Sequence, residues 1–225
     1  MNIKDNILRV KERIEKAKEK VGRKDSIYIL GATKGVLHHK IRQAYEAGIQ
    51  LFGENRIQEA IPKIEKLSDL NIEWHFIGHL QKNKVKAAIE NFSLIQSIDS
   101  IGLAKRLQQI AQIEEKIVPI LIEINIGGEE TKYGLKVEEL AQFIEELVKF
   151  ENLKLKGIMS IPPYNPDPEK VRVHFKEMYK IYEKLSSIFT SIEYLSMGMS
   201  EDFEVAIEEG SNMVRIGRAI FGERL

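Results

Sequence analysis

The chain has 225 residues, a length that fits one large domain or two small ones. Its 34 Lys and Arg balance its 34 Asp and Glu, so the formal net charge is zero. Electrostatics therefore gives no reason to expect nucleic acid or an acidic membrane as a partner. Hydrophobic residues make up 43% of the chain, which excludes general disorder and allows a sizeable core. The absence of cysteine excludes disulfides, thiolate catalysis and Cys-ligated metals, and it fits a reducing cytoplasm.

The first predicted element is an amphipathic helix of about five turns that ends at Gly22. Its apolar stripe, at steps of three and four, consists of Ile3, Ile7, Val10, Ile14, Ala17 and Val21. Because this pattern starts at the third residue, we expect no signal peptide. The longest apolar run, at 117–122, contains Pro119 and is too short for a membrane span, so we expect a cytoplasmic protein with no membrane partner.

Short β-rich runs then alternate with stretches of helical spacing. The runs lie at 27–30, 49–52, 72–77, 92–95, 118–124, 153–159, 192–195 and 213–216. The helical stretches lie at 37–47, 56–67, 84–89, 103–113, 137–148, 171–189 and 203–208. Strand followed by helix, repeated, is typical of a parallel sheet with crossover helices.

Eight strands at fairly even spacing favour closure into a barrel over an open sheet. We therefore predict an α/β fold, a single (β/α)8 TIM barrel with an extra N-terminal helix, in which residues 1–225 form one domain. An open doubly wound sheet is the main alternative. The Pro-rich stretch 161–168 follows the sixth predicted strand, where we expect a stiff loop rather than a linker between domains.

Polar residues gather at the ends of the predicted strands, where chemistry sits in barrels of this kind. Lys34 is the most suggestive of them, since it follows an apolar strand and is expected to point into the enclosed mouth of the barrel. Burial there would lower the pKa of its amine and favour attack on an aldehyde. The alternative is a lysine whose ammonium reaches solvent from the strand end.

Two loops near the C-terminus have the composition of a phosphate site. Segment 196–202 follows the seventh predicted strand and segment 215–222 follows the eighth, the usual phosphate position in these barrels. We expect the Ser200 hydroxyl and the backbone amides of Gly217 and Arg218 to contact an anion. Two ordinary turns with a serine cap are the alternative.

Arg215 is expected inside the barrel, because strand alternation places it on one face with Met213 and Gly217. A buried arginine must be paired or must face a ligand, since its charge cannot be removed. Two interpretations stay open, a salt bridge to Glu123 and a contact with the ring nitrogen of a cofactor.

No metal site is predicted. His75 and His79 lie about 13 Å apart along an extended strand, too far to share one zinc ion. Glu54 and Glu123 would form a glycosidase-like carboxylate pair only if the fold set them at the required separation.

Seven motifs together resemble the pyridoxal phosphate homeostasis protein family, also called the proline synthetase co-transcribed or YggS family. They occur in the expected order over nearly the whole chain, and the combination is highly specific although each motif alone is weak. The motifs are GATK at 31–34, FGENRIQE at 52–59, WHFIGHLQKNK at 74–84, NIGGEETKYGL at 125–135, GIMS at 157–160, LSMGMSED at 195–202 and VRIGRAIFG at 214–222.

This resemblance implies a barrel similar to the N-terminal domain of alanine racemase that binds pyridoxal 5′-phosphate. Lys34 would hold the cofactor as an internal aldimine, Arg215 would face the pyridine nitrogen and Asn55 would sit near the ring. The cofactor-binding residues implied, phosphate contacts included, are Lys34, Asn55, Met199, Ser200, Arg215, Gly217 and Arg218. Two positions depart from the family pattern: Thr33 replaces a common serine, and Glu123 stands where an uncharged residue is expected.

Function follows from the same comparison. Arginine does not hold the ring nitrogen protonated, so the cofactor is a weak electron sink. The racemase takes its second acid–base group from an additional domain, for which a chain ending at Leu225 has no room. We therefore predict a monomeric carrier and buffer of pyridoxal phosphate without catalytic residues, whose partners are the cofactor and pyridoxal phosphate-dependent apo-enzymes. The alternatives are an amino-acid racemase or decarboxylase that uses the same lysine, and a sugar-phosphate enzyme with a lysine Schiff base.

Overall fold

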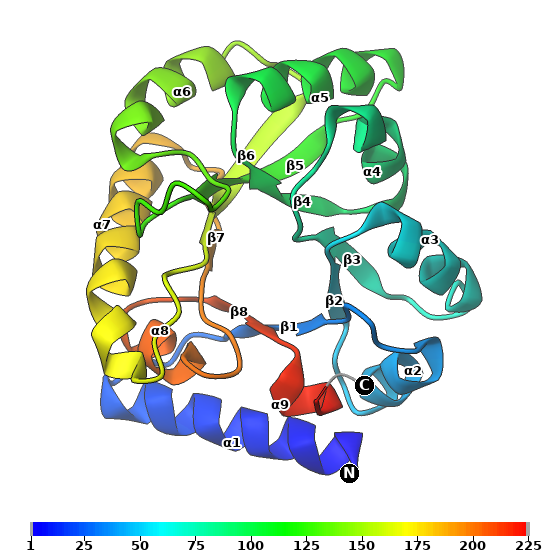
Figure 1. Ribbon diagram of the computed structural model, residues 1–225, viewed down its shortest axis with the longest axis vertical. Helices are drawn as coiled ribbons and strands as arrows, with labels where there is room; N and C mark the ends of the chain where they lie inside the picture. Colours follow the sequence, from blue (N-terminus) through cyan, green and yellow to red (C-terminus); the bar gives the residue numbers. More distant parts are fainter. Residues whose placement is uncertain (1, 224–225) are drawn as a thin grey trace.

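Eight parallel strands close into a barrel in the computed structural model, which describes residues 2–223 (Figure 1). Each strand pairs with the next in chain order, and β8 pairs with β1. The strands are β1 (Tyr28–Ala32), β2 (Leu51–Glu54), β3 (Glu73–Phe76), β4 (Leu94–Ile98), β5 (Val118–Ile124), β6 (Leu153–Ser160), β7 (Tyr194–Ser196) and β8 (Met213–Ile216). The predicted barrel is confirmed, and the open doubly wound sheet is wrong.

Helices surround this barrel on the outside (Figure 1). They are α1 (Ile3–Lys20), α2 (His38–Glu46), α3 (Ile57–Lys66), α4 (Val85–Asn91), α5 (Ile101–Ile113), α6 (Leu140–Leu147), α7 (Arg172–Ile188), α8 (Phe203–Glu208) and α9 (Arg218–Phe221). Short 3₁₀ turns, η1 (Lys82–Lys84), η2 (Val137–Glu139) and η3 (Pro168–Val171), lead into α4, α6 and α7. The sequence pattern did not predict α9, because its four residues are too few to show helical periodicity.

Several strands begin one or two residues later than the sequence pattern predicts. Ile49 and Phe92 were expected to start strands, yet both lie before the strand and are buried. Apolar residues in the turns that enter the barrel pack between the sheet and the helices. An apolar run in the sequence therefore predicts which residues are buried, whereas the first residue of a strand is determined by backbone hydrogen bonding to its neighbour.

The register of the barrel separates inward-facing from outward-facing side chains. Leu30 is paired with Arg215, and Gly53 is paired with Ala32 and with His75. Paired residues of parallel strands project to the same side of the sheet, so these side chains point into the barrel. Their neighbours point outward, as the packed rings of Phe52 and Trp74 show, with centroids 5.9 Å apart.

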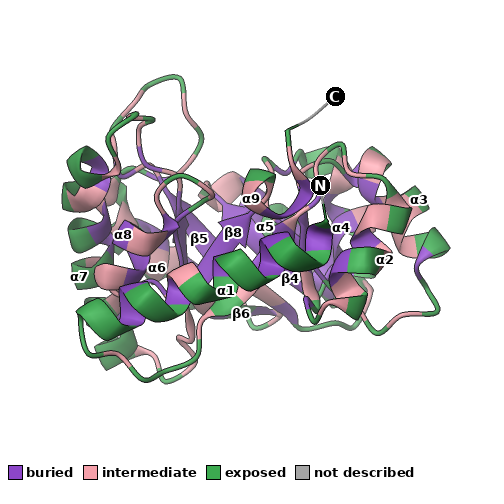
Figure 2. Cartoon of the chain, turned by 90° about the horizontal axis from the view of Figure 1, so that it is seen from below, coloured by how far each residue is buried: buried purple, intermediate pink, exposed green. Residues whose placement is uncertain are grey.

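The extra helix α1 packs against the outside of the ring beside α2, α8 and α9 (Figures 1 and 2). Arg13 donates to both carboxylate oxygens of Glu204 on α8, at 2.6 and 2.8 Å. Asn6 donates to the carbonyl of Ile220 on α9 at 2.7 Å. Since α8 and α9 follow the β7 and β8 loops directly, α1 fixes the two elements that position those loops.

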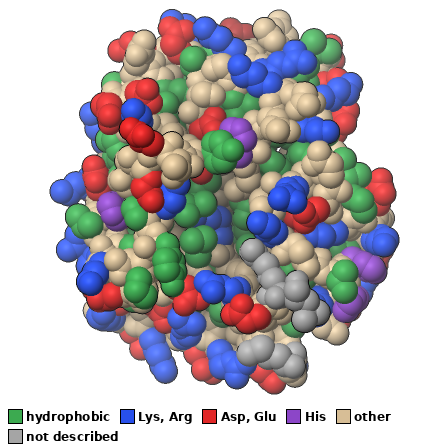
Figure 3. All heavy atoms as spheres, viewed as in Figure 1, with side chains coloured by type: hydrophobic (Ala, Val, Ile, Leu, Met, Phe, Trp, Pro, Cys, Tyr) green, Lys and Arg blue, Asp and Glu red, His purple; other side chains and the backbone are tan. Residues whose placement is uncertain are grey.

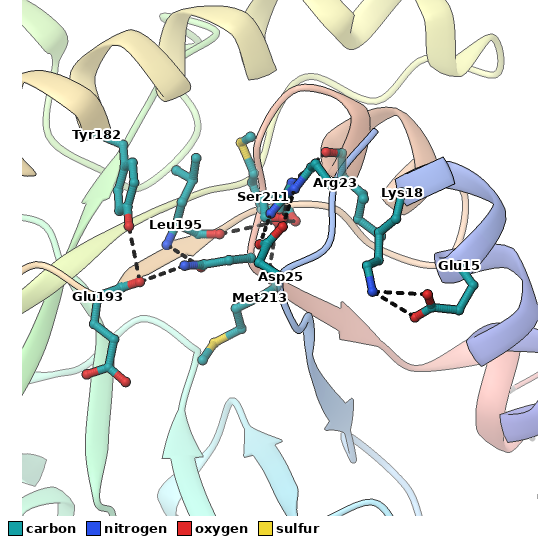
Figure 4. A network of polar contacts seen from close by, with 12 residues as sticks. Glu15, Lys18, Arg23, Asp25, Tyr182, Glu193, Leu195, Ser211 and Met213 are labelled. Carbon is teal, nitrogen blue, oxygen red and sulfur yellow. Dashed lines mark hydrogen bonds and ion pairs between the residues drawn. The ribbon is translucent and has the colours of Figure 1, made fainter. Parts of the chain in front are cut away.

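A second network fixes the chain that enters β8 (Figure 4). The Arg23 guanidinium donates to the carbonyls of Ile207 and Ser211, at 2.7 and 2.9 Å, at the end of α8. The Ser211 hydroxyl lies within hydrogen-bond distance of the carbonyls of Leu195, Met197 and Met213. These contacts tie the end of α8 to β7 and β8.

No helix among residues 2–223 is long and apolar enough to cross a bilayer.

Two adjacent residues of α1 test how much this helix contributes. Ile7 is 1% exposed and Leu8 is 50% exposed. We expect Ile7→Ala to lower the free energy of unfolding by about 3 kcal/mol, because it leaves a cavity between α1 and the barrel. The matched variant Leu8→Ala should change it by less than about 0.5 kcal/mol. Urea unfolding measures both, and equal effects would show that α1 is not packed as described.

Candidate functional site

The candidate site lies at the end of the barrel where the strands finish. Lys34 follows β1 in a tight turn, in which the Val36 amide donates to the Thr33 carbonyl at 2.9 Å and Gly35 has a φ of +68°. A positive φ at this position is easy only for glycine, which fixes the shape of the turn. Lys34 is partly buried in this turn, two residues after the end of β1 at the rim of the barrel.

The strand that leads into Lys34 ends beside the turn between β8 and α9. Gly31 is paired with Ile216, so the end of β1 runs next to Gly217. A Cβ atom built on Gly217 would lie 3.4 Å from the carbonyl oxygen of Ala32 and 3.7 Å from its Cβ. The turn that carries the lysine therefore starts against the glycine of the second predicted phosphate loop.

The two predicted phosphate loops lie against each other. The Ala219 amide, in the first turn of α9, donates to the Ser200 hydroxyl oxygen at 3.2 Å. Arg218 forms an ion pair with Glu201 at 3.0 Å. One small cluster thus contains the Ser200 hydroxyl and the start of α9, as expected for loops that bind one anion together.

Met199 takes part in the turn at the start of the first of these loops. Its backbone amide donates to the Asp202 carboxylate at 2.6 Å, in a turn that begins α8. Of the pair Met199 and Ser200, only the serine presents a hydroxyl to the neighbouring loop.

Arg215 is buried on β8 with 4% exposure. Its guanidinium donates to the carbonyl and hydroxyl oxygens of Ser196, both at 2.8 Å, and to the Ser160 carbonyl at 2.8 Å. Burial lowers the pKa of Arg215 to about 10, against the opposing effect of Glu123 and Asp202, so the side chain stays charged at neutral pH. Within the described chain none of its hydrogen bonds goes to Glu123, so the salt-bridge interpretation is wrong.

A chain of hydrogen bonds crosses the barrel from Arg215. The Ser196 hydroxyl donates to the Gln96 side-chain oxygen at 2.7 Å, and the Gln96 amide nitrogen lies 2.9 Å from Nδ1 of His75. Nε2 of His75 lies 3.0 Å from Glu73. Each buried polar group thereby receives a partner, which keeps the orientation of Arg215 defined. Sequence reasoning missed Gln96, because a single polar residue in an apolar strand carries no motif.

Behind Lys34, on the outer side of the sheet, a buried ion pair supports its turn. Glu54 accepts from the Thr33 hydroxyl at 2.6 Å and from Lys63 of α3 at 2.5 Å. Lys63 also donates to the Thr33 carbonyl at 2.8 Å. Both the backbone and the side chain of the residue before Lys34 are thus held. The carboxylate-pair interpretation of Glu54 is wrong, because its side chain is engaged here, outside the barrel.

Asn55 follows β2 at the same rim. Its side-chain oxygen is buried and has no hydrogen-bond partner among residues 2–223. The hydroxyl oxygen of Ser160, at the end of β6, is in the same state. A Cβ on Gly78 would lie 2.2 Å from the Asn55 carbonyl oxygen, so the ends of β2 and β3 meet without side-chain space between them. Buried polar atoms without partners are typical of surfaces that a polar ligand completes.

The opposite rim of the mouth carries acidic and aromatic groups. The His79 ring stacks on Tyr133 with centroids 3.8 Å apart, and its Nδ1 lies 3.0 Å from Asp99. Tyr133 belongs to the loop after β5, which Asn125 shapes through hydrogen bonds with Glu129. His75 points into the barrel and His79 toward this loop. No group of three or more potential metal ligands occurs in the part of the chain that the structure describes.

The space-filling view shows this face hollowed at its centre (Figure 3). Hydrophobic side chains, Lys or Arg, and a His border the hollow. We call the ends of β1 and β8, which carry Lys34, Arg215 and Arg218, the basic side of the mouth. The ends of β4 and β5, which carry Asp99 and Glu123, form its acidic side.

Comparison with known proteins gives one consistent result. The alanine racemase N-terminal domain family matches residues 2–225. The pyridoxal phosphate homeostasis protein of Aquifex aeolicus is 46% identical over 226 residues, which cover 100% of this chain and 99% of that protein. This chain belongs to the pyridoxal phosphate homeostasis protein family.

Solved structures support the same family assignment. The structure of PipY from Synechococcus elongatus PCC7942, with PLP bound, superimposes with a TM-score of 0.82 at 31% identity, covering 94% of this chain and 99% of PipY. Alanine racemase from Clostridium difficile 630 shares 18% identity with a TM-score of 0.75. The superposition covers 99% of this chain and 59% of that racemase. At this low identity the likeness shows the fold alone. The family expected from the sequence motifs is confirmed.

The buried pair behind Lys34 gives a stability prediction. We expect Lys63→Met to lower the free energy of unfolding by about 3 kcal/mol, because the fully buried Glu54 loses its charged partner. Lys66, exposed on the same helix, provides the control, and Lys66→Met should change it by less than about 0.5 kcal/mol. Urea unfolding at pH 7 measures both variants. A loss below 1 kcal/mol, on the scale of a surface pair, would contradict the buried ion pair.

Glu123 of β5 gives a pH prediction. Burial and the charge of Asp99 raise the pKa of Glu123 from 4.5 to about 7, and Arg215 opposes this rise. Above pH 4.5 the unfolded carboxyl ionises first, so this residue makes the protein less stable as the pH rises toward 7. In the unmodified protein, ionisation of Glu123 should lower the free energy of unfolding by on the order of 3 kcal/mol between pH 4.5 and 8. We expect Glu123→Gln to abolish this fall. Urea unfolding across this range measures it, and parallel profiles would contradict a buried acid at this position.

Proposed function

We propose that this protein binds pyridoxal 5′-phosphate in the mouth of the barrel and serves as a carrier and buffer of that cofactor. The observation that supports the proposal is that β1, which leads into the turn of Lys34, ends next to Gly217, that the two loops after β7 and β8 are bonded to each other, and that Arg215 is buried on β8. A primary amine, an anion site and a fixed cation are the three features that a phosphorylated aromatic aldehyde requires.

Each residue has a proposed role toward the cofactor. Lys34 would be the point of covalent attachment, because the bound aldehyde reacts reversibly with amines. The Met199–Ser200 segment, with Gly217 and Arg218, would hold the phosphate group, and the two loops that carry these residues lie against each other. Arg215 would face the ring nitrogen, and Asn55 would contact the ring, since its buried side-chain oxygen has no partner in the described chain.

Arg215 supports a carrier more than an enzyme. Its guanidinium is charged and is held by Ser196 and Ser160, so it donates hydrogen bonds but gives up no proton to a ring nitrogen. Cofactors of this class need a protonated ring to withdraw electrons strongly during amino-acid chemistry. We therefore propose that turnover of amino acids by racemisation or decarboxylation is absent or very slow.

The proposal extends to the setting of the protein. We propose a monomer in the cytoplasm that exchanges the cofactor with pyridoxal phosphate-dependent apo-enzymes. Relatives named for homeostasis of the cofactor support this role. Light scattering on the purified protein tests the monomer, and transfer of the cofactor to a purified apo-enzyme tests the exchange.

Attachment to Lys34 has a spectroscopic test. We expect the protein mixed with pyridoxal phosphate to acquire a visible absorbance band that Lys34→Ala loses, because the conjugated bond to the amine is removed. The control Lys66→Ala removes an exposed lysine of α3 and should keep the band. A band of equal height in Lys34→Ala would contradict the proposed attachment.

The same samples separate a carrier from an enzyme. Pure loaded protein is incubated with L-alanine, and formation of D-alanine is followed by chiral chromatography. Sustained turnover that Lys34→Ala abolishes would establish the racemase instead of the carrier.

A further inference from the structure

Glu123 is a buried acid at the mouth that none of the proposed cofactor contacts uses. It is 8% exposed, near the end of β5. It is paired with Met159, which is paired with Ser196, and Ser196 binds the inward-facing Arg215. Because paired residues project to the same side, the Glu123 carboxyl points into the barrel.

The surroundings of Glu123 disfavour its ionised form. Its carboxyl group has no hydrogen bond to any residue between 2 and 223, and a carboxylate without donors is costly to bury. Asp99 reaches the same space from the end of β4, where His79 holds its carboxylate at 3.0 Å. Arg215, from β8, is the opposing positive charge. Burial of Glu123 and the nearby charge of Asp99 both favour the protonated form of Glu123.

We propose that Glu123 is a ligand-facing acid that carries a proton while the mouth holds its anionic ligand, and that its ionisation weakens retention of that ligand. The inference rests on the proposed binding of pyridoxal phosphate. It adds a residue that adjusts affinity to pH.

Electrostatics gives the direction of the effect. A phosphorylated aldehyde brings negative charge into a mouth whose fixed buried cation is Arg215. An ionised Glu123 would compete for that cation and repel the ligand, whereas the neutral acid does neither. Burial and Asp99 place the ionisation of Glu123 at a pKa of about 7, within the range in which the pH of a cell varies.

Equilibrium binding of pyridoxal phosphate tests the proposal. Dissociation constants are measured by absorbance for the unmodified protein, Glu123→Gln and the control Glu151→Gln, at pH 6 and pH 8. Glu151 is exposed at the opposite end of the barrel, before β6. Because the charge of the cofactor phosphate changes with pH in the same way for all three proteins, only the ratio between proteins reports on Glu123.

We expect affinity to fall about tenfold more between pH 6 and pH 8 in the unmodified protein and in Glu151→Gln than in Glu123→Gln. An equal fall in all three proteins would overturn the inference while leaving the proposed function intact. Absence of binding by the unmodified protein at either pH would instead overturn the proposed function.

A measurement on the unmodified protein covers the case in which Glu123→Gln does not fold. Glutamate is labelled with ¹³C at its side-chain carboxyl carbon, and the protein is titrated by NMR. We expect one carboxyl resonance to titrate near pH 7 in the free protein and to stay protonated at that pH when pyridoxal phosphate is bound. A spectrum in which every glutamate is ionised by pH 6 would overturn the inference.

Discussion

The structure depends on closing the sheet between β8 and β1. In that pairing Leu30 is opposite Arg215, which turns the guanidinium into the barrel, and Gly31 is opposite Ile216. The same pairing brings the turn of Lys34 beside Gly217. A change of one residue in this register would turn Arg215 outward and expose its charge to the helix layer. The register therefore sets both the core and the candidate site.

A charged side chain inside a barrel requires a complete set of partners. Arg215 has them in Ser196 and Ser160, and the chain continues through Gln96 to His75. These groups occupy interior positions that apolar residues fill in most barrels of this type. Several core positions are thus occupied by polar residues that hold the Arg215 guanidinium in a fixed place. Such a use of the core is understandable if the cation contacts a ligand.

The outer layers support the basic side of the mouth. Helix α1 holds α8 through Arg13 and α9 through Asn6, and the ion pair of Lys63 and Glu54 holds Thr33. Each contact lies directly behind a segment assigned to the cofactor. The acidic side is built differently, from a loop that stacks Tyr133 on His79.

Much of this architecture was predictable from the sequence because strand and helix periods differ clearly. The alternation of apolar runs gave all eight strands, and strand alternation put Arg215 inside. Other features have no local signature. The partners of Arg215 come from β6 and β7, and Lys63 reaches Glu54 from the next helix, so only the fold brings them together. The capture of the Met199 amide by Asp202 likewise depends on loop geometry that composition does not fix.

A crystal structure of the protein grown with pyridoxal phosphate would test the central claim most directly. We expect continuous density from the Lys34 side chain to the cofactor, with the phosphate at Ser200 and Gly217 and the ring nitrogen within hydrogen-bond distance of Arg215. Density for the cofactor on another lysine, or a phosphate group away from the β7 and β8 loops, would contradict it.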